Sequence, residues 1–182
     1  MPQKAHRYEL ANQARFLTFS CHDHQPLLAT PAARNAFATS LAKARTTYNF
    51  KLLAWVAMPE HVHLLLVPDL PKWPVPKLLW GLKRGSSTRI KNALRATADP
   101  LHGATADPKG SRATTPPPPS SPIWQPGGGY DRNIRDLAEL NEKITYIHNN
   151  PVTRALVPHP EDWPWSSATW YRTGTGLVTI DR

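Results

Sequence analysis

The sequence has almost no cysteine: Cys21 is the only one among 182 residues. A single cysteine cannot form a disulfide within the chain, which fits a reducing compartment. No stretch approaches the roughly 18 apolar residues of a membrane-spanning helix, and the first residues lead into no apolar signal segment. We therefore expect a cytoplasmic protein without a membrane partner.

Acidic residues are also scarce. There are 13 of them against 22 Lys and Arg, so the net charge is +9. This excess favours an anionic partner such as nucleic acid, or a membrane surface, and the basic residues are scattered rather than gathered in a tail. The length predicts one domain over residues 1–182 with its own core. Self-association is left open.

The most informative motif is His61-Val62-His63, which follows Met58-Pro59-Glu60. Because proline cannot donate to a sheet, residues 58–60 predict the turn of a hairpin. Its strands would span residues 51–57 and 61–67. Side chains two apart in a strand share a face, so the two histidines are expected side by side, about 6.6 Å apart along the strand.

Two imidazoles at this spacing can hold one divalent cation between them. The alternative is a polar, half-exposed strand face, since two ligands alone do not make a metal site. Glu60 could support the histidines, but a turn residue that faces water is the expectation.

The other elements follow from apolar periodicity and from proline and glycine. Residues 96–122 repeat Ala-Thr-Ala-Asp-Pro, end in a proline run and have almost no large apolar side chain, so they predict a disordered or extended insert. The remaining predictions are strands over 15–21 and 130–135 and helices over 32–47, 77–95 and 136–149.

The helix over 77–95 carries a basic stripe that contains no acidic residue. This favours contact with a phosphate backbone over an ordinary solvated face. Trp80 lies near the stripe and could stack on an unpaired base, although a position at the rim of the core is an equal alternative. The candidate DNA-binding residues are Lys77, Lys83, Arg84 and Lys91.

The helix after Asp136 turns Tyr146 away from its own apolar face. Asn150 lies one helical turn later, so the two side chains are expected to project together. The oxygen of a carboxamide can bind a hard divalent cation. His148 lies on the apolar side and is expected to pack rather than to bind a metal. Pro151 predicts that the helix ends near residue 149.

Three segments together resemble a known family. They are Met58-Pro59-Glu60-His61-Val62-His63, Tyr146-Ile147-His148-Asn149-Asn150-Pro151-Val152 and Trp163-Pro164-Trp165-Ser166-Ser167. The combination resembles the single-tyrosine transposases of the HUH class, and most closely the REP-associated tyrosine transposases. The resemblance covers nearly the whole chain except residues 96–122. It implies an α+β fold with a ferredoxin-like core and an added helix that carries the tyrosine.

The resemblance also implies a mechanism. His61, His63 and Asn150 would bind Mg²⁺ or Mn²⁺, and Tyr146 would attack a DNA phosphate to leave a 5′-phosphotyrosine and a free 3′-OH. The substrate would be single-stranded DNA next to a hairpin. Three alternatives remain at this point: a nickase of the replication-initiator type, a nuclease without a covalent intermediate, and a DNA-binding module of the same fold that has lost catalysis.

Overall fold

The structure is a computed structural model that describes residues 12–98 and 122–181. Its main elements follow the order strand, helix, strand, strand, helix, strand, helix, as the sequence predicts. They are β1 (Arg15–Ser20), α1 (Pro31–Thr47), β2 (Lys51–Ala57), β3 (His61–Val67), α2 (Val75–Ala98), β4 (Tyr130–Asn133) and α3 (Leu137–Thr153), with a short α4 (Ala168–Thr173) near the C-terminus.

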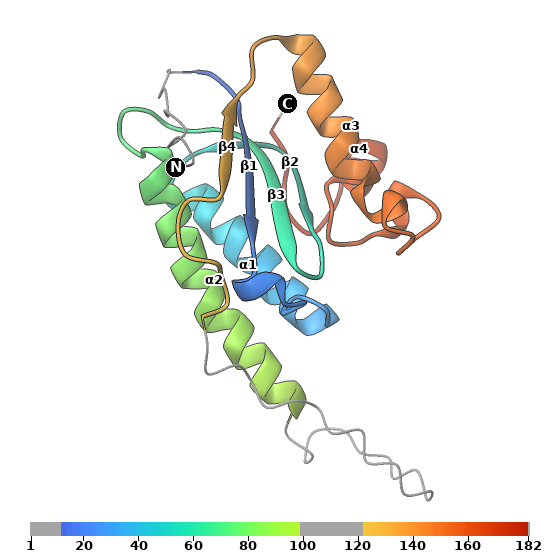
Figure 1. The fold of residues 1–182 in the computed structure, drawn as a ribbon. Coiled ribbons are helices and arrows are strands. Elements are labelled where there is room, and N and C mark those ends of the chain that lie inside the picture. The colour runs from blue at the N-terminus through green and yellow to red at the C-terminus, as the bar shows by residue number, and fades with distance from the viewer. Residues whose placement is uncertain (1–11, 99–121, 182) are drawn as a thin grey trace, which may run out of the picture.

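The four strands form one antiparallel sheet in the order β2-β3-β1-β4. With α1 after β1 and α2 after β3, this is a ferredoxin-like core, and the predicted α+β class is confirmed. Figure 1 shows α1 and α2 together on one side of the sheet and α3 on the other. The sheet is therefore covered on both faces, by different helices.

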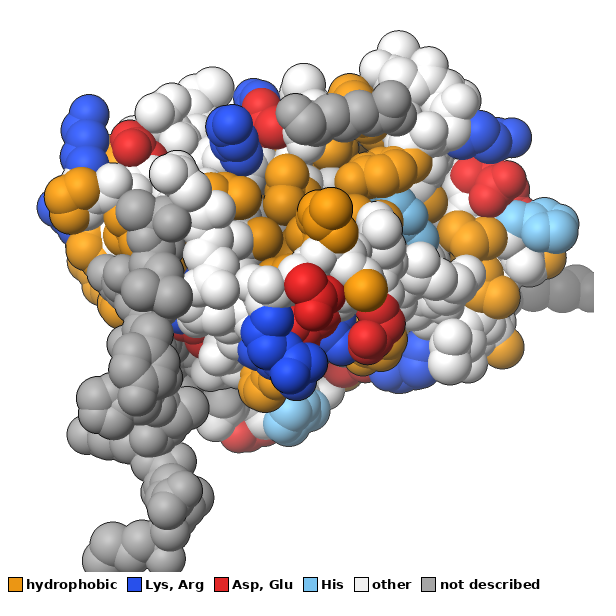
Figure 2. All heavy atoms as spheres, turned by 90° about the horizontal axis from the view of Figure 1, so that it is seen from above, with side chains coloured by type: hydrophobic (Ala, Val, Ile, Leu, Met, Phe, Trp, Pro, Cys, Tyr) orange, Lys and Arg blue, Asp and Glu red, His pale blue; other side chains and the backbone are white. Residues whose placement is uncertain are grey.

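Alternation along the strands sends neighbouring side chains to different cores. Leu64 is fully buried in the cluster that α1 and α2 cover, whereas the adjacent Leu65 is fully buried in a smaller cluster beneath α3. The same alternation places His61 and His63 on the α3 face. Seen from above, described basic side chains stand beside acidic ones and form no patch of one sign (Figure 2).

Two predicted helix ends are wrong. The helix expected to stop near residue 149 continues through Pro151 to Thr153. Pro151 is buried, and its carbonyl oxygen accepts a hydrogen bond from Leu156 N at 2.9 Å, so the next segment stabilises the last turn. Helix α2 extends to Ala98, three residues beyond the expected end, and the rest of the predicted insert up to residue 121 lies outside the described residues.

The described helices are all too short or too polar to cross a membrane. The outer edge of β2 is covered by the C-terminal segment, where Ala57 N donates to Trp165 O and Ser167 N donates to Trp55 O, each at 2.9 Å. This contact brings the tryptophan-rich motif of the sequence against the hairpin that carries the two histidines.

Candidate active site

The two histidines of β3 point their rings at the same place. His61 Nε2 lies 3.0 Å from His63 Nε2, and the ring centroids are 4.7 Å apart. Two donor atoms bound side by side to one Mg²⁺ at about 2.1 Å each and at right angles would lie about 3.0 Å apart. The observed spacing therefore fits two ligands of one cation.

The opposite ring nitrogens have partners of their own. His61 Nδ1 donates to the Glu60 carboxylate at 3.0 Å. His63 Nδ1 lies 2.7 Å from the Thr18 hydroxyl of β1, which is its cross-strand neighbour. Such partners fix ring orientation and direct the Nε2 lone pair towards a metal. Thr18 cannot be recognised from sequence, because its role depends on how β1 and β3 pair.

Helix α3 supplies the predicted third ligand. Asn150 Nδ2 lies 3.2 Å from His63 Nε2, and Asn150 Oδ1 is buried without a hydrogen-bond partner. An unpaired buried carboxamide oxygen is costly, and it is also the atom that a hard cation would take. No three described His, Cys, Asp or Glu side chains gather into a metal-binding group, so this amide remains the candidate for a third ligand. The side chains of His61, His63 and Asn150 therefore fit a divalent cation.

Tyr146 stands beside the same ring. Its centroid lies 5.2 Å from that of His63 and 6.0 Å from that of Phe16, and Phe16 in turn stacks on His63 at 5.5 Å. The side chain remains 48% exposed. A tyrosine that packs against the candidate ligands while staying open to solvent can reach a substrate, and its position together with Asn150 is the one that the sequence predicts.

The expectation that Glu60 faces water is wrong. Its side chain is only 18% exposed, because it binds His61 and also accepts a hydrogen bond at 2.7 Å from Arg154, the residue that caps the C-terminus of α3. The ion pair between Glu60 and Arg154 thus connects α3, which carries Tyr146, to the hairpin of β2 and β3, which carries the two histidines. No sequence signal identifies Arg154, because it lies 94 positions from its partner.

Burial keeps both histidines neutral at neutral pH, which is the form that binds a metal. It lowers the pKa of His63 to about 3, and the nearby His61 adds to the effect. Burial also lowers the pKa of His61, although the Glu60 carboxylate acts in the opposite direction. For Glu60, burial would raise the pKa, but Arg154 and His61 outweigh it and keep the pKa below its usual value.

His148 is a packed residue, as predicted. Its Nε2 lies 2.8 Å from the Ser167 hydroxyl, and its ring contacts Tyr171 at 4.9 Å. Burial lowers its pKa to about 4. It belongs to the contact between α3 and the C-terminal segment, apart from the paired histidines.

The predicted DNA-binding residues lie on α2, on the other side of the sheet from the histidines. Lys77 and Arg84 are exposed and lie over the rings of Trp73 and Trp80 at 4.5 Å and 5.2 Å. Lys91 is half-buried. Lys83 is half-buried as well, and its ammonium group donates to two main-chain carbonyl groups.

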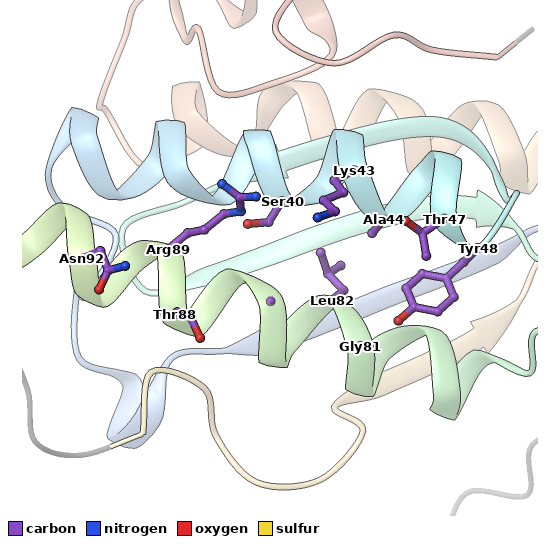
Figure 3. Close-up of a pocket in the computed structure, with 11 residues that line it drawn as sticks. Ser40, Lys43, Ala44, Thr47, Tyr48, Gly81, Leu82, Thr88, Arg89 and Asn92 are labelled. Atoms are coloured by element: carbon purple, nitrogen blue, oxygen red, sulfur yellow. The ribbon is translucent and has the colours of Figure 1, made fainter.

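A cavity of about 460 Å³ lies between α1 and α2 (Figure 3). Arg89 extends from α2 towards α1 across it, with Ser40 and Lys43 on the facing helix. Because α1 and α2 cover the opposite face of the sheet from His61 and His63, this cavity is separate from the candidate active site.

Comparison with known proteins gives consistent results. Residues 15–105 match the family model described as IS200-like transposase. The chain is 24% identical over 176 residues to a REP-associated tyrosine transposase of Escherichia coli (strain K12), which covers 96% of this chain and 87% of that protein. A solved structure of a REP-associated tyrosine transposase bound to a REP hairpin aligns with a TM-score of 0.64 at 20% identity, over 99% of this chain and 92% of the other. The structural likeness confirms the fold.

Proposed function

Since the chain belongs to the IS200-like transposase family, we propose that it cuts and rejoins single-stranded DNA through a covalent bond to Tyr146. One observation carries the proposal. Tyr146 packs 5.2 Å from the ring of His63, which holds its Nε2 within 3.0 Å of His61 Nε2. A nucleophile of this kind beside a pair of candidate metal ligands suits phosphoryl transfer, in which a metal ion offsets the charge on the phosphate under attack.

His61, His63 and Asn150 are the residues that would hold Mg²⁺ or Mn²⁺. Such an ion would polarise the scissile phosphate and offset the negative charge that develops on it. Mn²⁺ suits imidazole ligands at least as well as Mg²⁺ does. The buried, unpaired Oδ1 of Asn150 supports its assignment as the third ligand.

The covalent step balances without an added reagent. The Tyr146 oxygen loses its proton and attacks the phosphorus, and the bond from phosphorus to the 3′ oxygen breaks. The 3′ oxygen takes up a proton, and the 5′ end stays on the tyrosine. Because the new bond is again a phosphodiester, another 3′-OH can reverse the step. Lys143, which also pairs with Glu142, holds its ammonium group 6.0 Å from the centre of the tyrosine ring.

The substrate proposal is DNA with a hairpin. The solved relative is bound to a REP hairpin, and the excess of basic residues in this chain suits a polyanion. Lys77 and Arg84 are exposed on α2 and are our candidates for contact with the phosphate backbone. They lie away from the histidine face, so they would bind DNA at a distance from the cut.

The test uses labelled oligonucleotides from the DNA that flanks the gene, with Mg²⁺ or Mn²⁺. Wild-type protein should form a protein–DNA adduct that survives SDS, and Tyr146→Phe should form none. Tyr48→Phe is the matched control, because this tyrosine lines the cavity on the other side of the sheet. It should form the adduct as wild type does.

Cleavage by both wild type and Tyr146→Phe without an adduct would identify a hydrolytic nuclease instead. Binding without cleavage across a full set of flanking oligonucleotides would favour a DNA-binding module. Either result would overturn the proposed covalent mechanism.

A further inference from the structure

Trp80 is more exposed than any other Phe, Tyr or Trp side chain that the structure describes, at 62%. Its neighbour Leu79 is buried in the core, so α2 is firmly packed and the outward position of the indole is set by the helix. Arg84 lies one turn further on, with its guanidinium carbon 5.2 Å from the centre of the indole ring. An exposed indole beside an arginine offers a flat surface for a π-system and a cation for a phosphate.

The indole borders a cavity of about 470 Å³ between α2 and the loop over residues 122–128. This volume lies within the roughly 300–1,000 Å³ typical of small-ligand sites. None of the described residues that line it is acidic, and Lys83 and Arg84 are basic. The cavity therefore suits an anionic ligand that has an aromatic part.

The loop that forms the other wall is held in place. Lys83 Nζ donates to the carbonyl oxygens of Gln125 and Gly127 at 3.1 Å and 2.7 Å, and Trp124 Nε1 donates to the Ser86 hydroxyl at 2.9 Å. Figure 1 shows this loop running alongside α2 before it enters β4. A wall fixed in this way is formed before a ligand arrives, which lowers the entropic cost of binding.

A second cavity of about 200 Å³ continues the first towards the active site. The two share Lys83, Gln125 and Pro126 as lining residues. The second also reaches Thr18, the partner of His63. The pairing of β1 with β4 ends at Thr18, and beyond it the loop over residues 122–128 lies along the edge of β1, where Gln125 N donates to Ser20 O at 3.0 Å. The track therefore follows this loop around the edge of the sheet.

We propose that this track guides an unpaired stretch of DNA between the active site and α2, and that one base stacks on Trp80 while Arg84 contacts an adjacent phosphate. The inference rests on the proposed function, because it takes single-stranded DNA as the substrate. It adds a binding subsite on the far side of the sheet edge. The path would separate the base that is read from the phosphate that is cut.

The test measures binding by fluorescence anisotropy in the Tyr146→Phe background without added metal, so that the result is independent of catalysis. The probes are a blunt DNA hairpin and the same hairpin with an unpaired extension. Trp80→Ala should weaken binding of the extended hairpin by about tenfold or more, in line with the loss of one stacked base. It should leave the blunt hairpin unaffected, and Trp80→Phe should restore most of the loss.

Leu177→Ala is the matched control, since this side chain is 51% exposed and lies outside both cavities. Abasic substitutions along the extension should reveal one position whose cost is large with Trp80 and absent with Trp80→Ala. The inference would be overturned if Trp80→Ala weakened binding of both hairpins equally, if its effect added to that of every abasic substitution, or if it had no effect on binding. Each of these results would leave the proposed function intact. Failure of the protein with Trp80 intact to bind either hairpin would overturn both.

Discussion

The two faces of the sheet are formed by the same strands but carry different kinds of side chain. The face beneath α1 and α2 is an apolar core in which Leu17, Leu64 and Leu66 have no exposed surface. The face beneath α3 has a smaller apolar cluster, and next to it lie His61 and His63 with their polar partners. The alternation of β3 therefore divides one strand between a stabilising face and a chemical face.

This division explains how a buried polar site is tolerated. Polar groups that are taken from water cost free energy unless they are paired, and each histidine here has a partner at Nδ1. The apolar face offsets the remaining cost by burying large side chains. The comparison predicts that changes on the two faces separate activity from stability.

The largest effect is expected on the chemical face. His63→Ala removes a candidate metal ligand and should lower the rate of DNA cleavage by about a thousandfold or more, since metal-ion catalysis contributes several kcal/mol. Initial cleavage rates at saturating Mn²⁺ would measure it, with far-ultraviolet circular dichroism to check the fold. A rate within tenfold of wild type would contradict the assignment of His63.

Leu64 and Leu65 are an adjacent pair that compares the faces directly. Each is fully buried, so Leu64→Ala and Leu65→Ala should each lower the free energy of unfolding by about 2–5 kcal/mol. Only Leu65→Ala should also slow the folded enzyme, because Leu65 pairs with Phe16, whose ring stacks on His63. Urea denaturation and cleavage rates below the unfolding transition would separate the two effects. Equal losses of activity would contradict the division.

His148 should make stability depend on pH. Its folded pKa is about 4 against 6.5 for the ordinary side chain, so the unfolded state binds a proton first as the pH falls. The contribution of His148 to the free energy of unfolding is therefore highest above pH 6.5. It falls as the pH is lowered towards 4, by roughly 3 kcal/mol at most. His148→Gln should therefore lose less stability than wild type between pH 7 and pH 4.5 in urea titrations. The control is the exposed His159→Gln, and an unchanged pH dependence in His148→Gln would contradict the account.

The smallest effect concerns the residue that orients His61. Glu60→Gln keeps the size of the side chain but removes the charge that binds His61 and Arg154. Metal affinity should fall by about 10–100-fold, as is typical when a supporting partner of a metal ligand is changed. Calorimetric titration with Mn²⁺ measures it without reference to catalysis. Affinity equal to wild type would show that Glu60 serves only the contact with Arg154.

Local patterns predicted much of the site because its residues come in short, periodic segments. The histidines were found by their spacing on a strand, and Tyr146 and Asn150 by their spacing on a helix. The hairpin strands have the predicted bounds because Pro59 marks the turn between them.

Long-range pairing could not be predicted in the same way. Thr18 meets His63 only through the register of β1 and β3, and Arg154 meets Glu60 only when α3 packs on the hairpin. Pro151 misled the prediction of the helix end because local propensity yields to tertiary contacts, here the hydrogen bond from Leu156. The exposure of Trp80 likewise became clear only from the packing of α2.

The most direct measurement is to locate the covalent bond. Adduct trapped with a short oligonucleotide would be digested with trypsin and nuclease and analysed by tandem mass spectrometry. Trypsin cuts after Lys143 and Arg154, so the peptide of residues 144–154 carries Tyr146 and no other of the 5 tyrosines. We predict a nucleotide joined through its 5′ phosphate to Tyr146. A nucleotide on another residue, or cleaved DNA with no modified peptide, would contradict the central claim.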